Sequence, residues 1–412
     1  MSYQLLTTEQ LKIKLKFEKN SLTGMEVRNS CNKTFRMMQD GKLVTIFGER
    51  ETDFSHLKKR AEKYLPYGRL VDYEFPELLH LKERKPPCTD FFKSLNLEEM
   101  KEVGLKIVSR LSKDFPDQAV DLELFKIENN IHLENSAEKR ADYLANEFHA
   151  GLLLSSCSEN DIFVFGPTFN RIPDSYKAIE AYIDDTAAYL QHCQNISHIK
   201  PGSYPFIFTP DIVADQALQS LFAGFAPRSL ENGTSPLLSK RDSKILNDKF
   251  TLLDSAEFIP FDMDGVPTRE ITFVEKGTLK HFPVMLRSAG KLNMPPTGSN
   301  CSSGYGSALQ LKAGEKPVKE LIKNLDEGVI LLMAGDLFMG NIVNGDMSGT
   351  IQLGLHVKNG EILGRLKGGS LSFNFYEAFG KNLLEFSKES ERFGGSSYIQ
   401  CPFALVNEIV VN

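Results

Sequence analysis

Asp262 and Asp264 stand two residues apart in the segment Phe261–Thr268 (FDMDGVPT), where an extended chain would turn both side chains to one face. Two carboxylates on one face can bind a cation, or act as a general acid and a general base. The alternative is structural: Asp264-Gly265 is a turn signal, and Asp262 would then accept hydrogen bonds from backbone amides. Turn statistics favour the structural alternative.

Cys301 is the candidate nucleophile, because it lies in the Gly/Ser-rich segment 297–306 (TGSNCSSGYG), whose backbone amides could form an anion-binding nest. A reactive thiol also needs a neighbouring cation or a helix N-terminus, and the sequence indicates neither. An inert loop thiol is therefore the favoured interpretation. The six cysteines are spread along the chain without a CxxC pair, which predicts reduced thiols.

Histidine spacing gives no indication of a metal site. None of the eight histidines is followed by Glu, so there is no HExxH helix. The closest pair, His192 and His198, spans the expected end of a helix, and we expect these side chains at the surface or at helix ends.

Composition narrows the class of protein. The 412 residues include 48 Lys and Arg and 54 Asp and Glu, giving a formal charge of −6, and 41% are hydrophobic. These values are typical of a globular protein of two or three domains. The lack of a long basic run argues against a nucleic acid or an anionic membrane as partner. No apolar run reaches the roughly 20 residues that cross a bilayer, and Met1–Lys14 lacks the apolar centre of a secretory signal, so we expect a cytoplasmic protein.

The first half of the chain mixes strand and helix patterns. Apolar periodicity predicts amphipathic helices over Leu97–Leu111 and Ser175–Cys193, the second with Ser175 as its N-terminal cap. Strands are expected at Gly41–Phe47 and 161–166, and a hairpin at Leu122–Leu133 that turns at Asn129-Asn130. We therefore expect an N-terminal α+β domain over residues 1–200.

The second half is Gly-rich, with repeated turn signals between apolar runs. The turns fall at Asp264-Gly265, Lys276-Gly277, Asn344-Gly345 and Asn359-Gly360, and the runs include Phe206–Phe208, Ile271–Val274 and Val329–Met333. Helices are expected over Ile212–Phe225, Pro317–Leu325 and Phe375–Ser387. The pattern predicts a β-rich C-terminal domain, residues 201–412, with a curved or barrel-like sheet, and hence an α+β, two-domain fold.

The order of motifs in this second half resembles that of the TldD/PmbA family, whose members are also described as modulators of DNA gyrase and as TldD/TldE metallopeptidases. Phe261–Arg269 with Glu275–Leu279 is similar to the family's D-x-E-G-x-x-T strand pair, with Asp264 in place of Glu. Thr297-Gly298, Asn344–Gly349 and Val357–Ile362 are similar to its Gly-rich, N/T-G-D-x-S and V-x-N-G-E segments.

The resemblance distinguishes two types of chain. The TldD type holds zinc with an HExxxH helix and a C-terminal Cys, and the PmbA/TldE type lacks the histidines. Here the zinc-helix positions fall on Asp215, Gln216 and Ser220, and Cys401 occupies the place of the third ligand. Ser is a poor ligand and Gln has no basic carboxylate. Positions i and i+5 lie about 140° apart on a regular α-helix, so we expect this chain not to keep the widened turn that a zinc-bearing helix needs.

The resemblance thus implies a PmbA/TldE-like non-zinc subunit of a peptidase. Its partner would be a TldD-type metallopeptidase chain or a second copy, its substrate a small or unfolded peptide, and zinc would come only from the partner. The implied substrate-binding residues are Asp262, Asp264, Cys301, Asn344, Asp346 and Ser348. Two alternatives stay open: a self-sufficient hydrolase that uses Asp262, Asp264, Cys301 or Cys401, and a peptide-binding module without chemistry.

Overall fold

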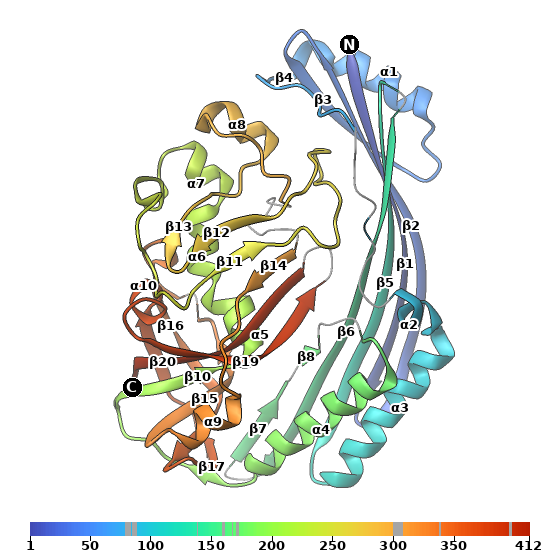
Figure 1. Cartoon of the computed structure of the whole chain (residues 1–412). Coiled ribbons are helices and arrows are strands. Elements are labelled where there is room, and N and C mark those ends of the chain that lie inside the picture. The colour runs from blue at the N-terminus through green and yellow to red at the C-terminus, as the bar shows by residue number, and fades with distance from the viewer. Residues whose placement is uncertain are drawn as a thin grey trace.

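The N-terminal half forms one long, curved sheet. The structure is a computed structural model that describes residues 1–412 except 79–83, 85–88, 138, 159–160, 167, 170–172, 300–307, 338 and 395–397. The strands of this sheet follow the order β4-β3-β2-β1-β5-β6-β7, and β8 also pairs with β6 (Figure 1). Their bounds are β1 (Ser2–Glu18), β2 (Ser21–Gln39), β3 (Lys42–Glu49), β4 (Arg69–Leu70), β5 (Ala119–Asn135), β6 (Arg140–Ser158), β7 (Asp161–Phe165) and β8 (Thr168–Phe169).

Helices cover the two ends of this sheet: α1 (Phe54–Tyr64) lies at one end and α2 (Thr89–Ser94), α3 (Leu97–Asp114) and α4 (Tyr176–His192) at the other (Figure 1). The helix predicted from Leu97 is confirmed, and Asn96 caps it by accepting hydrogen bonds from the backbone amides of Glu98 and Glu99. The second predicted helix is also confirmed. The Ser175 hydroxyl, however, bonds to Asp174 and does not cap that helix.

The C-terminal half contains the barrel that the sequence predicts. Strands β10, β15, β16, β18 and β20 pair in a closed ring, which leaves no free edge within the ring. The strands of this half are β9 (Ile196–Ser197), β10 (Gly202–Phe208), β11 (Leu252–Asp254), β12 (Ile271–Glu275), β13 (Thr278–Leu279), β14 (Ala308–Leu311), β15 (Glu327–Gly335), β16 (Asp346–Lys358), β17 (Glu361–Leu366), β18 (Ser370–Asn374), β19 (Leu383–Gly394) and β20 (Tyr398–Val411). The fold is therefore strand-rich α+β, as expected.

The expected turns fall where glycine can take a positive φ. Gly265, Gly277, Gly345 and Gly360 have φ of 83°, 75°, 91° and 75°. The helical segments of this half are α5 (Pro210–Ile212), a π-helical turn (Val213–Ala217), α6 (Gln219–Phe225), α7 (Pro227–Glu231), a 3-10 turn (Leu238–Lys240), α8 (Leu286–Leu292), α9 (Val318–Lys323), a 3-10 turn (Ile342–Asn344) and α10 (Phe375–Ala378).

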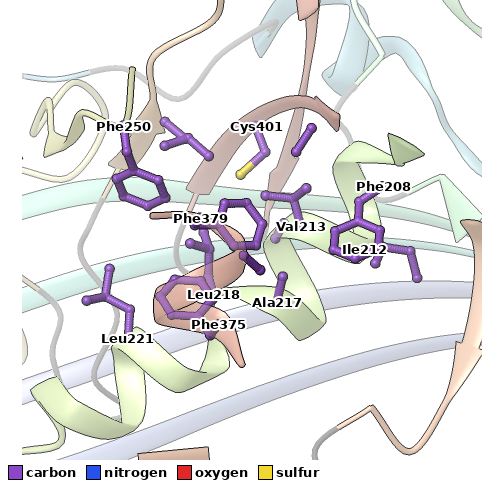
Figure 2. Close-up of a cluster of buried hydrophobic side chains, with 14 of the residues drawn as sticks. Phe208, Ile212, Val213, Ala217, Leu218, Leu221, Phe250, Phe375, Phe379 and Cys401 are labelled. Carbon is purple, nitrogen blue, oxygen red and sulfur yellow. The ribbon is translucent and has the colours of Figure 1, made fainter. Parts of the chain in front are cut away.

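The main core of this half surrounds the helix that begins at Pro210. Val213, Ala217 and Leu218 are fully buried, and Phe375, Phe379 and Cys401 pack around them in the same cluster (Figure 2). Because this helix packs against strand β20 and shares its apolar cluster with residues of helix α10, its apolar residues decide its orientation.

One predicted helix is wrong over most of its length. The segment Phe375–Ser387 forms only the short α10 before the chain turns and enters strand β19. Asn374 caps α10, and β19 then pairs with β20. Phe379 and Phe386 both pack into the barrel core, so an apolar spacing that fits a helix is satisfied here by a turn and a strand.

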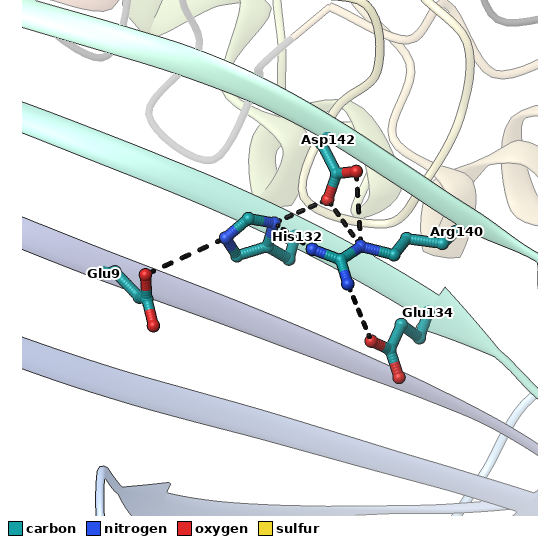
Figure 3. Close-up of polar contacts among 5 residues, drawn as sticks. All are labelled: Glu9, His132, Glu134, Arg140 and Asp142. Carbon is teal, nitrogen blue, oxygen red and sulfur yellow. Dashed lines mark hydrogen bonds and ion pairs between the residues drawn. The ribbon is translucent and has the colours of Figure 1, made fainter.

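The predicted hairpin at Asn129-Asn130 is also wrong, because β5 runs through both residues. It pairs with β1 on one side and β6 on the other, and the Asn129 side chain accepts a hydrogen bond from Gln10 across the sheet (2.9 Å). Close by, a polar network joins the same three strands: the ring Nδ1 of His132 lies 2.5 Å from Asp142 Oδ1, and Arg140 donates to the same carboxylate (Figure 3). Pairing on both sides overrides the local turn propensity.

The two halves share an apolar core. One buried cluster contains Phe17 and Leu111 from the first half and Ile330, Leu355 and Phe403 from the barrel. The proposed division between residues 200 and 201 therefore falls in a chain whose halves pack directly on each other. It also separates β9 from β17, the strand with which β9 pairs.

Gly104 gives a test of how helix α3 packs on the N-terminal sheet. A Cβ built on Gly104 would lie 2.4 Å from two ring atoms of the buried Phe17. We expect Gly104→Ala to lower the free energy of unfolding by roughly 1–3 kcal/mol, although alanine favours the helix. The chain has no Trp, so unfolding in urea would be followed by circular dichroism.

Two variants control for other causes. Phe17→Leu in the same chain should relieve the clash, so that the double variant loses less stability than the sum of the single variants. Glu102→Ala, an exposed position on the same helix, should change stability by less than about 0.5 kcal/mol. If Gly104→Ala were as stable as the parent chain, this account of how α3 packs on the sheet would be wrong.

Candidate functional site

The helix that aligns with the family's zinc helix keeps the widened turn, contrary to our expectation. The backbone amide of Leu218 donates to the carbonyl of Val213, five residues earlier, at 3.1 Å. Its buried residues are spaced four apart, as in Val213, Ala217 and Leu221. On a regular α-helix, side chains spaced four residues apart rotate about 40° around the axis at each step. One π-turn offsets this rotation and keeps these side chains facing the core. The apolar spacing was the sequence signal for this turn.

The three positions on this helix have different surroundings. Asp215 is exposed, Gln216 is half-buried, and Ser220 is fully buried. The Gln216 amide donates to the carbonyl of Ala334 at 3.3 Å, while its Oε1 and the Ser220 hydroxyl are buried without a hydrogen-bond partner. Two unsatisfied polar atoms on one buried surface are unusual in a packed core.

Two carboxyl groups and a thiol near this helix have raised pKa values. Burial raises the pKa of Asp211. Partial loss of solvation, followed by the nearby Asp211 carboxylate, raises the pKa of Asp215 to about 6. Burial and the Asp215 carboxylate raise the pKa of the Cys401 thiol well above its ordinary value. Cys401 and Asp215 are therefore neighbours, and the thiol is held in its un-ionised state.

The Asp262–Thr268 segment forms the turn that turn statistics favoured. Oδ1 of Asp262 accepts hydrogen bonds from the backbone amides of Asp264 and Val266, each at 2.9 Å. The Asp264 carboxylate instead pairs with Arg36 of β2 at 2.6 Å, and the same guanidinium donates to the Met263 carbonyl. The two carboxylates therefore have separate roles in the turn, which docks on the concave face of the N-terminal sheet.

Burial, followed by the Asp264 carboxylate, raises the pKa of Asp262 to about 7. Tyr143 lies beside it, with its ring 5.0 Å from that of Phe261, and burial and Asp262 raise the pKa of this phenol. Asp262 thus titrates near neutral pH.

The predicted Gly-rich loop can be followed only at its start. Gly298 has φ 71°, and a Cβ there would lie 2.2 Å from the carbonyl oxygen of Pro267, so the loop begins directly against the Asp262 turn. Cys301 lies outside the described residues.

Asp346 and Ser348 line a hollow of about 420 Å³ at one end of the barrel. The Asp346 carboxylate accepts a hydrogen bond from the Asn374 amide at 3.0 Å, and the same amide donates to the carbonyl of Asn344. The Ser348 hydroxyl donates to the carbonyl of Met339. Asp346 and Ser348 therefore line the same hollow, and Asn344 is joined to it only through its backbone carbonyl, which accepts from Asn374.

Two further carboxylates, Glu377 and Glu408, complete the acidic lining of this hollow. Glu408 has φ 58°, and it lies at a break in the register between β20 and β10. Such a bulge turns a side chain out of the regular alternation of a strand. The sequence offered no signal for Glu408, because nothing in its neighbours indicates a bulge. The hollow can accept hydrogen bonds from a cationic or amide-bearing group.

No hydrogen bond or ion pair between described residues links this hollow to the Asp262 turn.

One polar group inside the fold escaped the sequence analysis. His356, which the sequence did not single out, is buried, and its ring nitrogens lie 2.8 Å from the Ser197 hydroxyl and 3.0 Å from Glu327. It joins β16 to the neighbouring strand β15 and to β9, whose Ser197 lies 159 residues earlier in the sequence.

In the described part of the chain, no three His, Cys, Asp or Glu side chains are close enough together to hold a metal ion. Nor is any described helix long and apolar enough to cross a membrane.

The fold and these sites define a strand-rich α+β protein with a barrel-containing C-terminal half. Residues 201–412 match the family model described as the PmbA/TldA metallopeptidase C-terminal domain. The chain therefore belongs to the PmbA/TldD family.

Three similar proteins give the extent of the likeness. An uncharacterized protein of Methanocaldococcus jannaschii is 23% identical over 91% of this chain and 89% of its own length. A zinc metalloprotease TldD homolog of Saccharolobus solfataricus is 26% identical over 42% of each chain. The crystal structure of TldE from Thermococcus kodakarensis covers 100% of this chain and 96% of its own with a TM-score of 0.87, at 19% identity, and so shares the fold.

Asp262 predicts a pH dependence of stability. A carboxyl whose pKa is about 7 in the folded chain keeps a proton that the unfolded chain releases near pH 4. The free energy of unfolding therefore falls as the pH rises from about 4 to 7 and is unaffected by this group above that range. Asp262→Asn keeps the acceptor oxygen without the charge, so at pH 8 it should be more stable than the parent by roughly 1–3 kcal/mol.

Urea unfolding at pH 5 and pH 8 measures this difference, which should fall to about a third at the lower pH. Asp264→Asn, which removes the ion pair with Arg36, controls for a general loosening of the turn and should lower stability. An Asp262→Asn variant with the pH slope of the parent would contradict the assignment.

Proposed function

We propose that this chain is a PmbA/TldE-like, non-zinc subunit that associates with a TldD-type zinc metallopeptidase chain. Together they would enclose a chamber in which small or unfolded peptides are cleaved in the cytoplasm. The partner would supply the zinc ion and the general base, while this chain would bind and align the peptide backbone.

The observation that carries the proposal is the donor set on the π-turn helix. A zinc ion needs deprotonated, strongly donating ligands. Here the Cys401 thiol is held protonated, Ser220 offers a hydroxyl, and Gln216 offers an amide that already bonds to Ala334. These side chains do not fit zinc, and a carboxamide cannot take a proton from water.

The hollow at the barrel end supports a role in peptide binding. Its carboxylates suit the amine or guanidinium group of a peptide, and its amide and hydroxyl groups suit the peptide backbone. We assign Asn344, Asp346 and Ser348 to this role. The turn at Asp262 and Asp264 and the loop that contains Cys301 would border the same chamber.

Reconstitution tests the subunit role. The isolated chain and a TldD-type chain from the same cells would be purified separately and mixed, and zinc content and peptide cleavage would be measured for each sample. We expect bound zinc and peptide cleavage only in samples that contain the TldD-type chain. Cleavage should be faster in the mixture than with the TldD-type chain alone. Asp215→Asn and Cys401→Ser should leave the activity of the mixture within about twofold.

Opposite results would support the self-sufficient hydrolase. If the isolated chain bound one zinc ion and cleaved peptides, and if Asp215→Asn or Cys401→Ser abolished that activity, the non-zinc assignment would be wrong. Asp262→Asn would then test the second carboxylate of that alternative.

Asp346 tests the hollow separately. In the reconstituted complex, Asp346→Ala should raise KM for a Lys- or Arg-containing peptide about tenfold with little change in kcat, because the contact is the same in the ground and transition states. Asp346→Asn should show a similar loss while keeping the acceptor for Asn374. Glu361→Ala, an exposed acidic residue on β17, is the control, and a KM unchanged by Asp346→Ala would remove the hollow from the peptide site.

A further inference from the structure

One edge of the N-terminal sheet is open over part of its length. β1 pairs with β2 along one side, whereas β3 covers only Asn32–Gln39 on the other. Among the described residues no strand pairs with the segment Gly24–Ser30 on that side. We call this segment the β2 edge, and in Figure 1 it follows the outer margin of the sheet.

The β2 edge carries two charged residues, Glu26 and Arg28, but it lacks other devices that usually protect a strand from pairing with another strand. Natural proteins blunt exposed edges with Lys, Pro, bulges or covering segments. The β2 edge contains neither Lys nor Pro, and its register with β1 is unbroken from Gly24 onward. Met25 and Val27 are 55% and 53% exposed. Regular, unpaired and partly apolar, the segment is suited to β-sheet extension.

Its charge pattern is complementary to itself. When two copies of the β2 edge run antiparallel about Val27, each Glu26 lies directly opposite the Arg28 of the other copy. Such directly opposed opposite charges stabilise a strand pair. The two Val27 side chains would also meet at the two-fold axis, with Met25 opposite Asn29.

Within one chain, Arg28 has an unfavourable neighbour. It lies directly opposite Lys12 of β1, while Glu26 lies opposite Lys14. Like charges directly opposite one another are destabilising, and Arg28 makes no ion pair with any described residue. A Glu26 from a second copy would supply the missing opposite charge.

We propose that a second copy of this chain docks on the β2 edge, in antiparallel register centred on Val27, to give one sheet continuous across a two-fold axis. The contact is isologous, with the same surface used by both copies, and so it closes as a dimer. The proposal deepens the proposed subunit role by naming an association surface. It rests on the proposed function only because that function requires the chain to associate with another chain. Its test measures association alone, so its failure differs from a failure of peptidase activity.

Charge reversal tests the register. Sedimentation equilibrium of the full chain would give the dimer dissociation constant for the parent, Glu26→Arg, Arg28→Glu and the double variant. Each single reversal opposes like charges twice in the dimer and should raise the dissociation constant at least about tenfold. The double variant exchanges the two charges and should return to within about threefold of the parent.

Arg28→Glu separates association from folding. It places an acid opposite Lys12, so it should hold or raise the stability of the monomer while weakening the dimer. Urea unfolding at a concentration where the chain is monomeric measures the first effect. Glu361→Arg, an exposed reversal on β17 far along the chain, should leave the dissociation constant unchanged.

Cross-linking tests the geometry. Val27→Cys should form a disulfide-linked dimer on mild oxidation, because position 27 faces itself across the axis. Met25→Cys has nearly the same exposure and lies on the same strand, but it is displaced from its own copy by four residues, roughly 13 Å, and should not cross-link.

Four results would overturn the proposal. The parent chain could remain monomeric at 100-fold or more above ordinary working concentrations, or dimerise with no response to either charge reversal. Met25→Cys could cross-link as readily as Val27→Cys. Capture of a TldD-type chain on this edge in place of a second copy would overturn the choice of occupant.

Discussion

The architecture of the C-terminal half depends on one constraint: the helix that begins at Pro210 must bury residues spaced four apart. Val213, Ala217 and Leu221 face the barrel core together with Ala214, Leu218 and Phe222. A regular α-helix would rotate the later members of these rows out of the core, and the π-turn prevents this. Strand β20 and helix α10 pack around the helix in this position, and so the barrel-end hollow, whose rim includes α10 and the end of β20, depends on it too.

The relation between the halves depends on the turn at Asp262. Its glycine, Gly265, has a positive φ, and a Cβ there would lie 2.9 Å from Leu133 and 3.0 Å from Gln4. The turn can therefore approach the sheet closely only with glycine at this position. Arg36 then holds Asp264 and Met263 from the sheet side. The segment with Asp262 and Asp264, which in the sequence could have been a catalytic pair of carboxylates, thus joins the two halves of the structure.

The sequence predicted features whose cause is local. The helix from Leu97 carries its own cap at Asn96, and the turns at Gly265 and Gly345 need a positive φ, so neighbouring residues are enough to identify them. The sequence-based predictions were wrong where residues distant in the sequence determine the local structure. Asn129 and Asn130 stay in β5 because strands flank them on both sides, Phe386 enters a strand because β20 offers a pairing edge, and His356 is buried by partners from other strands. No window of neighbouring residues contains that information.

The π-turn also explains how the geometry of a metal-binding helix can exist apart from metal chemistry. The side chains that shape it are apolar residues on the core face, and those at the family's zinc positions, Asp215, Gln216 and Ser220, contribute none of that apolar packing. Packing energy therefore maintains the backbone whichever donors occupy those three positions. The backbone identifies the family, and the activity must be argued from the donor atoms. Here these are an amide, a buried hydroxyl, a protonated thiol and a single exposed carboxylate.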